Sequence, residues 1–312
     1  MRNKIIEVNK LSKRYKKAKE LALDGVSFYV EKGAFFALLG PNGAGKTTTV
    51  SILNTTLSKT SGEATIDGLD IEKDSLKVRK NIGVIFQSPS LDKNLTAEEN
   101  IRFHVNLYGL YPYRFTFSMM DKKYQKKVIK MAGLLGIEND IHKPIKTFSG
   151  GMKRKLEILR SLMHEPKVLF LDEPTTGLDP ISRSNLWDYL IDLRKKKNVT
   201  IFLTTHYLEE AENADYACVI NKGKVVAKGS PQDIKDQLVE RFMVVDAKKR
   251  NELLKELKKF KVKISGKGPY KVVLNGIQPQ KIVQKTKTPL TLLEIHNPTL
   301  EEAYVEIIEK DS

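Results

Sequence analysis

Residues 40 to 47 read Gly-Pro-Asn-Gly-Ala-Gly-Lys-Thr, and this stretch decides how the first part of the chain folds. It fits the pattern Gly-x-x-x-x-Gly-Lys-Thr of a phosphate-binding loop. The apolar run from Phe35 to Leu39 suits a buried parallel strand, and residues 47 to 53 can form a helix. We therefore expect the loop to join a strand to a helix, which is the context that the motif requires.

This loop predicts contacts to the phosphates of a nucleoside triphosphate. Its glycines let the backbone approach a ligand closely, so that successive N–H groups and the helix N-terminus face phosphate oxygens. We expect Lys46 to reach the β- and γ-phosphates and Thr47 to supply a ligand to Mg²⁺. The residues expected to contact the nucleotide here are Gly40, Pro41, Asn42, Gly43, Ala44, Gly45, Lys46, Thr47 and Thr48. An ordinary glycine-rich turn is the alternative interpretation.

Two adjacent acids end a second apolar run. Residues 167 to 173 read Lys-Val-Leu-Phe-Leu-Asp-Glu, which predicts a strand that is buried on both faces. We expect Asp172 to hold Mg²⁺ through its water shell and Glu173 to act as the general base toward the attacking water. Ligands of parallel sheets gather at the carboxyl ends of the strands, so both acids should lie near the phosphate loop. An exposed acidic turn is the alternative.

A third motif lies shortly before the acidic strand. Residues 148 to 155 read Phe-Ser-Gly-Gly-Met-Lys-Arg-Lys, and the apolar residues that follow recur at helical spacing. Ser149 can cap the start of that helix. Taken alone, the triplet is more typical of a capping turn than of a binding site.

In their order and spacing, these motifs resemble the ATP-binding cassette family. The ordered set is the phosphate loop, Gln87 after the apolar residues 82 to 86, Ser149-Gly150-Gly151, Asp172-Glu173, Gly177-Leu178-Asp179, and His206 after residues 200 to 205. The resemblance covers roughly residues 3 to 230. It implies an α/β fold, a P-loop NTPase cassette with a mostly parallel core sheet, an antiparallel β subdomain, and a helical subdomain at about residues 88 to 160.

The resemblance also implies roles for single residues. The chain would be an ATPase with ATP and Mg²⁺ as cofactors, Tyr15 would stack on the adenine, and His206 would touch the γ-phosphate. Gln87 would connect the metal site to a transport partner. The residues expected to be catalytic are Lys46, Gln87, Glu173 and His206. The residues expected to hold the metal are Thr47, Gln87 and Asp172.

A dimer follows from the same resemblance. In this family the Ser-Gly-Gly signature of one protomer closes over the ATP held by another, so Ser149-Gly150-Gly151 would contact nucleotide across a homodimer or heterodimer, with Asp179 at the seam. Phe148 and Met152 depart from the common Leu-Ser-Gly-Gly-Gln form, which puts in doubt a side-chain hydrogen bond from position 152. The Ser-Gly-Gly-Met-Lys-Arg form and residues 94 to 100 resemble the exporter branch for drugs, lipids or polysaccharides.

Length and composition limit what surrounds this site. The 312 residues can bury a substantial core, and the single cysteine fits a reducing cytosol. The chain start lacks the apolar core of a signal peptide, and no run of about 18 apolar residues occurs. If the chain serves a transporter, as the resemblance implies, we expect its transmembrane permease to be a separate chain and the chain itself to lie on the cytoplasmic face of the membrane.

The net charge of +16 makes anionic partners plausible. Residues 111 to 160 carry twelve basic and four acidic side chains, which predicts either a solvated face or contact with anionic lipid head groups. A soluble cassette that acts on nucleic acid or ribosomes is an alternative, although no second cassette and no coiled-coil insertion are present between Lys46 and Asp172. A regulatory module that uses ATP as a switch is another alternative.

Beyond residue 230 the motifs stop and a different pattern begins. Residues 241 to 295 predict the order β-α-β-β-α-β of a ferredoxin-like α+β fold, followed by a helix at residues 299 to 308. We therefore expect a nucleotide-binding domain at residues 1 to 230 and an accessory domain at residues 231 to 312. The accessory domain contains no catalytic motif, so interaction, dimer support or regulation are its candidate roles.

Overall fold

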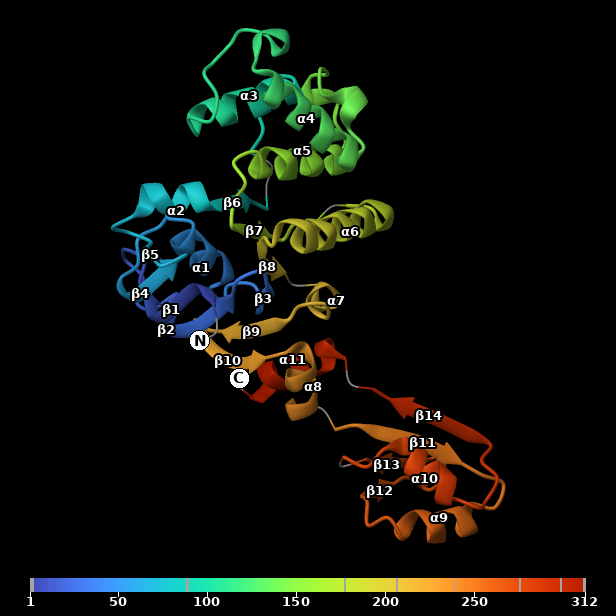
Figure 1. Ribbon diagram of the computed structural model, residues 1–312. Helices are drawn as coiled ribbons and strands as arrows, with labels where there is room; N and C mark the ends of the chain where they lie inside the picture. The colour runs from blue at the N-terminus through green and yellow to red at the C-terminus, as the bar shows by residue number, and fades with distance from the viewer. Residues whose placement is uncertain are drawn as a thin grey trace. The chain divides into compact units, whose positions relative to one another are not determined.

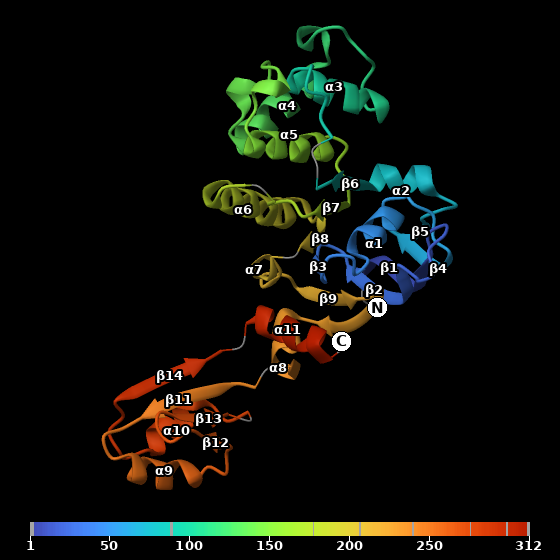
Figure 2. The same ribbon diagram turned by 180° about the vertical axis from the view of Figure 1, so that it is seen from behind.

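The computed structural model describes residues 3–87, 90–176, 178–205, 207–238, 240–274, 276–297 and 299–310. These residues form two compact units, 1–228 and 229–312, in the chain that Figures 1 and 2 show from opposite sides. Each unit has its own hydrophobic core.

A six-stranded sheet forms the centre of the first unit, with the strand order β10-β9-β3-β8-β7-β6 (Figure 1). The five strands from β9 to β6 in that order run parallel to their neighbours. The strands are β3 (Phe35–Leu39), β6 (Ile82–Ile85), β7 (Val168–Asp172), β8 (Thr200–Thr205), β9 (Tyr216–Asn221) and β10 (Lys224–Gly229). Every residue of β3, β7 and β8 is buried, which explains why these segments read as continuous apolar runs.

A second, four-stranded sheet has the order β2-β1-β4-β5 and antiparallel pairing. Its strands are β1 (Lys4–Lys13), β2 (Leu23–Glu31), β4 (Ser61–Ile66) and β5 (Leu69–Asp70). Two helices accompany the sheets, α1 (Lys46–Leu53) and α2 (Ser75–Asn81). One buried cluster contains residues of both sheets, including Phe28 of β2 and Phe36 of β3, whose rings stack 5.2 Å apart. The expected parallel core sheet and antiparallel β subdomain are thus confirmed.

The helical part of the first unit is drawn in green in Figure 1. Its helices are α3 (Ala97–Leu107), α4 (Lys122–Leu135) and α5 (Gly150–Leu162), with short 3-10 turns at Phe117–Met119, Glu138–Asp140 and Ile145–Thr147. Tyr124 is fully buried among them and donates a hydrogen bond to Glu98 over 2.9 Å. Two further helices, α6 (Pro180–Lys197) and α7 (Leu208–Ala211), follow in the sequence.

The second unit contains the predicted β-α-β-β-α-β order. Its sheet has the order β12-β13-β11-β14, and every neighbouring pair is antiparallel, as a ferredoxin-like fold requires. Its elements are α8 (Pro231–Leu238), β11 (Phe242–Asp246), α9 (Arg250–Lys258), β12 (Ile264–Ser265), β13 (Tyr270–Val273), α10 (Pro279–Lys285), β14 (Leu292–His296) and α11 (Leu300–Lys310). The appended helix α11 packs against α8 of the same unit. No helix in the described part of the chain is long and apolar enough to cross a bilayer.

We expect a chain that ends after Gly229 to remain folded. Among the residues that the structure describes, the buried clusters of the first unit end at Ile220, and that of the second unit lies between Met243 and Ile282. Removing one cluster therefore leaves the other intact. Circular dichroism and thermal melting should show a single cooperative transition for this fragment. An aggregated fragment would show that the predicted domain division is wrong.

Candidate functional site

The predicted phosphate loop joins β3 to α1. Gly43 and Gly45 have φ angles of 81° and 110°, a region that side chains disfavour. A Cβ atom on Gly45 would lie 2.6 Å from Leu23 and 2.8 Å from the carbonyl oxygen of Ala22. The loop can therefore take this shape only with glycine at position 45.

The start of α1 is suited to an anion. The first backbone N–H groups of a helix have no intrahelical acceptor, and α1 has neither a side-chain cap at Gly45 nor an acidic residue in its first turn to compete with an anion. Lys46 is 6% exposed, and its ammonium donates to the carbonyl oxygens of Gly40 and Pro41 over 2.7 and 3.2 Å. Burial lowers the pKa of Lys46, whereas Glu173 and Asp172 raise it. These residues fit a triphosphate group.

A pocket of about 530 Å³ opens over the loop. It is lined by Ala22, Pro41, Asn42, Gly43, Gly45, Lys46, Thr47, Thr48, Gln87, Glu173, Thr176 and Tyr207. Of the predicted contact residues in the loop, Gly40 and Ala44 are not part of this lining. Ala44 is buried, and Gly40 approaches the backbone of Ile220 so closely that a Cβ would lie 2.3 Å from its carbonyl oxygen. Gly40 and Ala44 therefore determine the shape of the loop without facing the pocket.

Glu173 and Gln87 meet in this pocket although 86 residues separate them in the sequence. The side-chain nitrogen of Gln87 donates to the Glu173 carboxylate over 2.8 Å. Glu173 directly follows β7, has a positive φ of 46°, and donates its backbone N–H to the carbonyl oxygen of Thr204 over 2.9 Å. The turn at Glu173 therefore directs its carboxylate into the pocket.

Asp172 precedes Glu173, is 6% exposed and is not among the residues that line the pocket. Burial raises the pKa of its carboxyl group, and a hydrogen bond from the Thr204 hydroxyl lowers it. Lys46 also favours the ionised form. A carboxylate here and the Thr47 hydroxyl on the loop are oxygen ligands of the kind that Mg²⁺ prefers, so these residues fit the expected metal.

Arg154 is a site residue that sequence reasoning missed. Its guanidinium is buried and donates to the carbonyl oxygens of Phe86, Pro174 and Glu173 over 2.5, 2.6 and 3.0 Å. It also pairs with the buried Glu157 over 3.1 Å. Arg154 thus ties the chain before Gln87 to the chain at Glu173. The sequence signal was an arginine three positions before Glu157, on a helix whose other charged residues, Lys153, Lys155 and Arg160, are all basic.

We expect Arg154→Met to destabilise the first unit by about 3–5 kcal/mol, because it leaves the buried Glu157 carboxylate without its ion-pair partner and frees three carbonyl oxygens. Urea denaturation measures this change. Lys155→Met is the matched control on the same helix and should stay within about 0.5 kcal/mol of the natural chain. Equal stability of the two variants would contradict this role of Arg154.

The signature lies apart from the phosphate pocket. Ser149 caps α5 by accepting the N–H of Met152 over 3.2 Å, and Asp179 caps α6 by accepting that of Ser182 over 2.9 Å. Hydrogen bonds from the hydroxyl and then from the backbone N–H of Ser182 lower the pKa of Asp179. A Cβ built on Gly151 would lie 3.2 Å from the Ser182 hydroxyl, so the two helix starts are neighbours. Neither Ser149-Gly150-Gly151 nor Asp179 lines the pocket over the loop.

The remaining predicted residues flank the loop or lie outside the described residues. Tyr15 is 44% exposed, and its hydroxyl lies 3.2 Å from that of Thr48. His206 and Gly177 fall outside the residues that the structure describes. Next to His206, the Thr205 hydroxyl donates to the buried Glu210 over 2.7 Å and accepts the N–H of Tyr207 over 2.9 Å, which fixes Tyr207 at the pocket.

Comparison with known proteins agrees with this geometry. The family model described as "ABC transporter" matches residues 23–176. The probable multidrug ABC transporter ATP-binding protein YbhF of Escherichia coli (strain K12) is 38% identical over 75% of this chain, which spans only 38% of YbhF. The doxorubicin resistance ATP-binding protein DrrA of Mycobacterium tuberculosis (strain ATCC 25618 / H37Rv) is 38% identical over 76% of this chain and 69% of DrrA.

A solved structure of an ABC transporter subunit has a similar fold. The structure of cbiO1 from Clostridium perfringens, part of the ABC transporter complex cbiONQ, is 30% identical with a TM-score of 0.65. The match covers 74% of this chain and 90% of cbiO1. The chain has a complete phosphate loop with an acid pair beside it, and it is 38% identical to DrrA over 69% of that relative. It therefore belongs to the ABC transporter family, as one of its ATP-binding cassettes.

Proposed function

We propose that the chain hydrolyses ATP and thereby powers a separate transmembrane permease. The observation that carries this proposal is the Glu173 carboxylate, which lies in the pocket of the phosphate loop and accepts a hydrogen bond from Gln87 over 2.8 Å. A chain that used ATP only as a switch would not need an acid at this place. A positioned carboxylate is what a general base toward water requires.

Each residue of the site has its own role in this proposal. Lys46 and the N–H groups at the start of α1 hold the phosphates, and Glu173 accepts the proton of the attacking water. Gln87 orients the Glu173 carboxylate, so it acts as a positioning residue. Thr47, Gln87 and Asp172 would hold Mg²⁺, which when bound offsets negative charge on the phosphates. Tyr15 and His206 would contact the adenine and the γ-phosphate.

We further propose that the partner permease is an exporter. The relatives named above are a probable multidrug transporter protein and a doxorubicin resistance protein. Drugs, lipids or polysaccharides are the candidate cargo classes. The ATPase would act as a homodimer or heterodimer on the cytoplasmic face of the membrane, because the signature and Asp179 lie away from the phosphate pocket of their own chain.

Two measurements test this function. Purified protein should release inorganic phosphate from ATP only when Mg²⁺ is present. The chain should also co-purify from membranes with a multi-span membrane protein, and its binding to RNA or DNA should be weak at physiological salt. Salt-sensitive nucleic-acid binding without a membrane partner would favour a soluble cassette instead. ATP binding without phosphate release would favour a regulatory module.

A further inference from the structure

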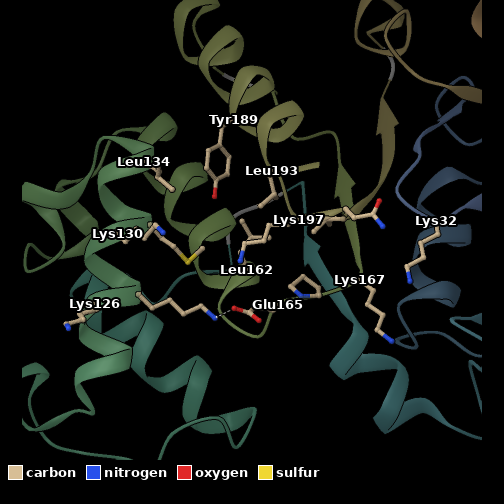
Figure 3. Close-up of a pocket in the computed structure, with 15 residues that line it drawn as sticks. Lys32, Lys126, Lys130, Leu134, Leu162, Glu165, Lys167, Tyr189, Leu193 and Lys197 are labelled. Atoms are coloured by element: carbon tan, nitrogen blue, oxygen red, sulfur yellow. Dashed lines mark hydrogen bonds and ion pairs between the residues drawn. The ribbon is translucent and has the colours of Figure 1, made fainter. Parts of the chain in front are cut away.

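A second pocket of about 630 Å³ lies in the first unit, away from the phosphate loop (Figure 3). It is bounded by α4, by the segment between α5 and β7, and by the end of α6. It shares no lining residue with the pocket over the phosphate loop. A ligand of this second pocket would therefore be distinct from the nucleotide.

The walls of this pocket are apolar. Its apolar lining residues are Met131, Leu134, Leu162, Pro166, Tyr189, Leu193 and Val199. Leu162 and Val199 are only 4% and 6% exposed, so the floor continues into the core. Figure 3 shows Leu134 on α4 and Tyr189 on α6 on the same side of the opening. A concave apolar surface of this volume is typical of small-molecule sites.

Lysines surround the apolar walls. The lining includes Lys32, Lys126, Lys127, Lys130, Lys167 and Lys197. Figure 3 shows Lys126 and Lys130 on one side of the pocket and Lys32 and Lys167 on the other. These lysines come from separate parts of the chain, whereas a solvated helix face would contribute lysines from one helix only.

Most of this positive charge is uncompensated. The single carboxylate of the lining, Glu165, is already bound by Lys127 over 2.8 Å. Lys167 pairs with Asp67. Among residues that the structure describes, no ion pair involves the remaining lining lysines, which are Lys32, Lys126, Lys130 and Lys197. An anion at the opening would thus meet several free ammonium groups.

We propose that this pocket binds a small amphipathic anion, an anionic head group carried by one apolar chain. The ammonium groups of Lys126 and Lys130 would bind the head group, and the walls at Leu134, Tyr189 and Leu193 would cover the apolar chain of the ligand. Charge and apolar burial would both be needed, because exposed lysines alone bind a small anion weakly in water. This inference does not depend on the proposed ATPase function.

Octyl phosphate is the probe that tests the proposal on the full chain by titration calorimetry. It should bind at one site per protein molecule. Octyl glucoside lacks the charge and inorganic phosphate lacks the octyl group, so each should bind at least about tenfold more weakly. Equal affinity for octyl phosphate and inorganic phosphate would overturn the proposal. So would binding of anionic lipid vesicles without binding of monomeric octyl phosphate, which would assign the lysines to a membrane surface.

Variants locate the bound probe. Lys126→Gln/Lys130→Gln should weaken octyl phosphate binding at least about fivefold, because it removes two free charges at the opening. Lys122→Gln/Lys123→Gln makes the same charge change on α4 outside the pocket lining and should leave the affinity unchanged. An equal loss in both pairs would show an effect of net charge alone and would contradict the pocket.

Two single substitutions complete the test. Leu134 is 62% exposed, so Leu134→Gln should leave the fold intact and still weaken binding of the octyl chain. Lys46→Ala should leave octyl phosphate binding unchanged, because Lys46 lies in the other pocket. Loss of binding in Lys46→Ala but not in Lys126→Gln/Lys130→Gln would place the probe at the phosphate loop and overturn the inference.

Discussion

Glu173→Gln is expected to lower ATP turnover by about two to four orders of magnitude while ATP and Mg²⁺ still bind. The glutamine keeps the size of the side chain but cannot accept the proton of the attacking water. The pocket stays open because the loop, Lys46 and Asp172 are unchanged. Steady-state phosphate release gives the turnover, and titration with a fluorescent ATP analogue gives the affinity.

The backbone turn at Glu173 does not depend on the Glu173 side chain. Glu173 has a positive φ of 46°, and its backbone N–H is bound by Thr204, so the turn is held independently of the side chain. The substitution should therefore leave the thermal melting temperature nearly unchanged. If two protomers share each ATP, as proposed, ATP-dependent dimers should accumulate, because ATP that is not hydrolysed would remain bound between them.

Glu209→Gln is the matched control for Glu173→Gln. Glu209 is exposed on the short helix α7 and does not line the phosphate pocket, so its neutralisation should leave turnover unchanged. Near-normal turnover of Glu173→Gln would reassign the base to another group. A loss of ATP affinity in Glu173→Gln would instead show that the carboxylate supports nucleotide binding.

The sequence predicted the phosphate pocket well because its parts are local. Positions 40 to 47 need glycines, a lysine and a threonine in a fixed order, and the strand before them must be apolar on both faces. The strand boundary at Leu39 agrees with the prediction, and α1 begins one residue earlier than expected. Topology then determined that β7 ends beside the loop, which brings Glu173 into the same pocket.

Long-range contacts could not be predicted in the same way. Arg154 binds carbonyl oxygens at Phe86 and Pro174, which lie 68 and 20 residues away, and no spacing rule relates these positions. The basic excess at residues 111 to 160 was likewise interpreted as a solvated or lipid-facing surface. Lys126 and Lys130 from that stretch line a pocket together with Lys32 and Lys197, which only the folded chain brings near them.

The signature raises the question of which chain completes each site. Ser149 and Asp179 start neighbouring helices, yet neither residue lines the pocket that contains Lys46 and Glu173. If the helix start at Ser149 binds phosphate, as its free N–H groups allow, the phosphate must then be held by a second protomer. This arrangement predicts that the two halves of a site can be supplied by different chains.

We expect mixed dimers of a Lys46→Ala chain and a Ser149→Arg chain to recover activity that neither variant has alone. In each homodimer both shared sites lack one half. In the mixed dimer, one site combines the intact Lys46 of one chain with the intact Ser149 of the other, so roughly half of the natural activity per dimer should return. Two affinity tags isolate the mixed species, and phosphate release measures its activity.

The decisive control places both substitutions in one chain and pairs it with a natural chain. This dimer carries the same two substitutions, but under a shared arrangement both of its sites are broken, so it should be inactive. If each chain instead forms its own complete site, the outcome inverts: the natural chain keeps working in this dimer, and the dimer of the two single variants stays inactive. Ser149 is exposed at the start of α5, so Ser149→Arg removes only its capping hydrogen bond at a cost of about 1 kcal/mol, and unfolding cannot imitate either pattern.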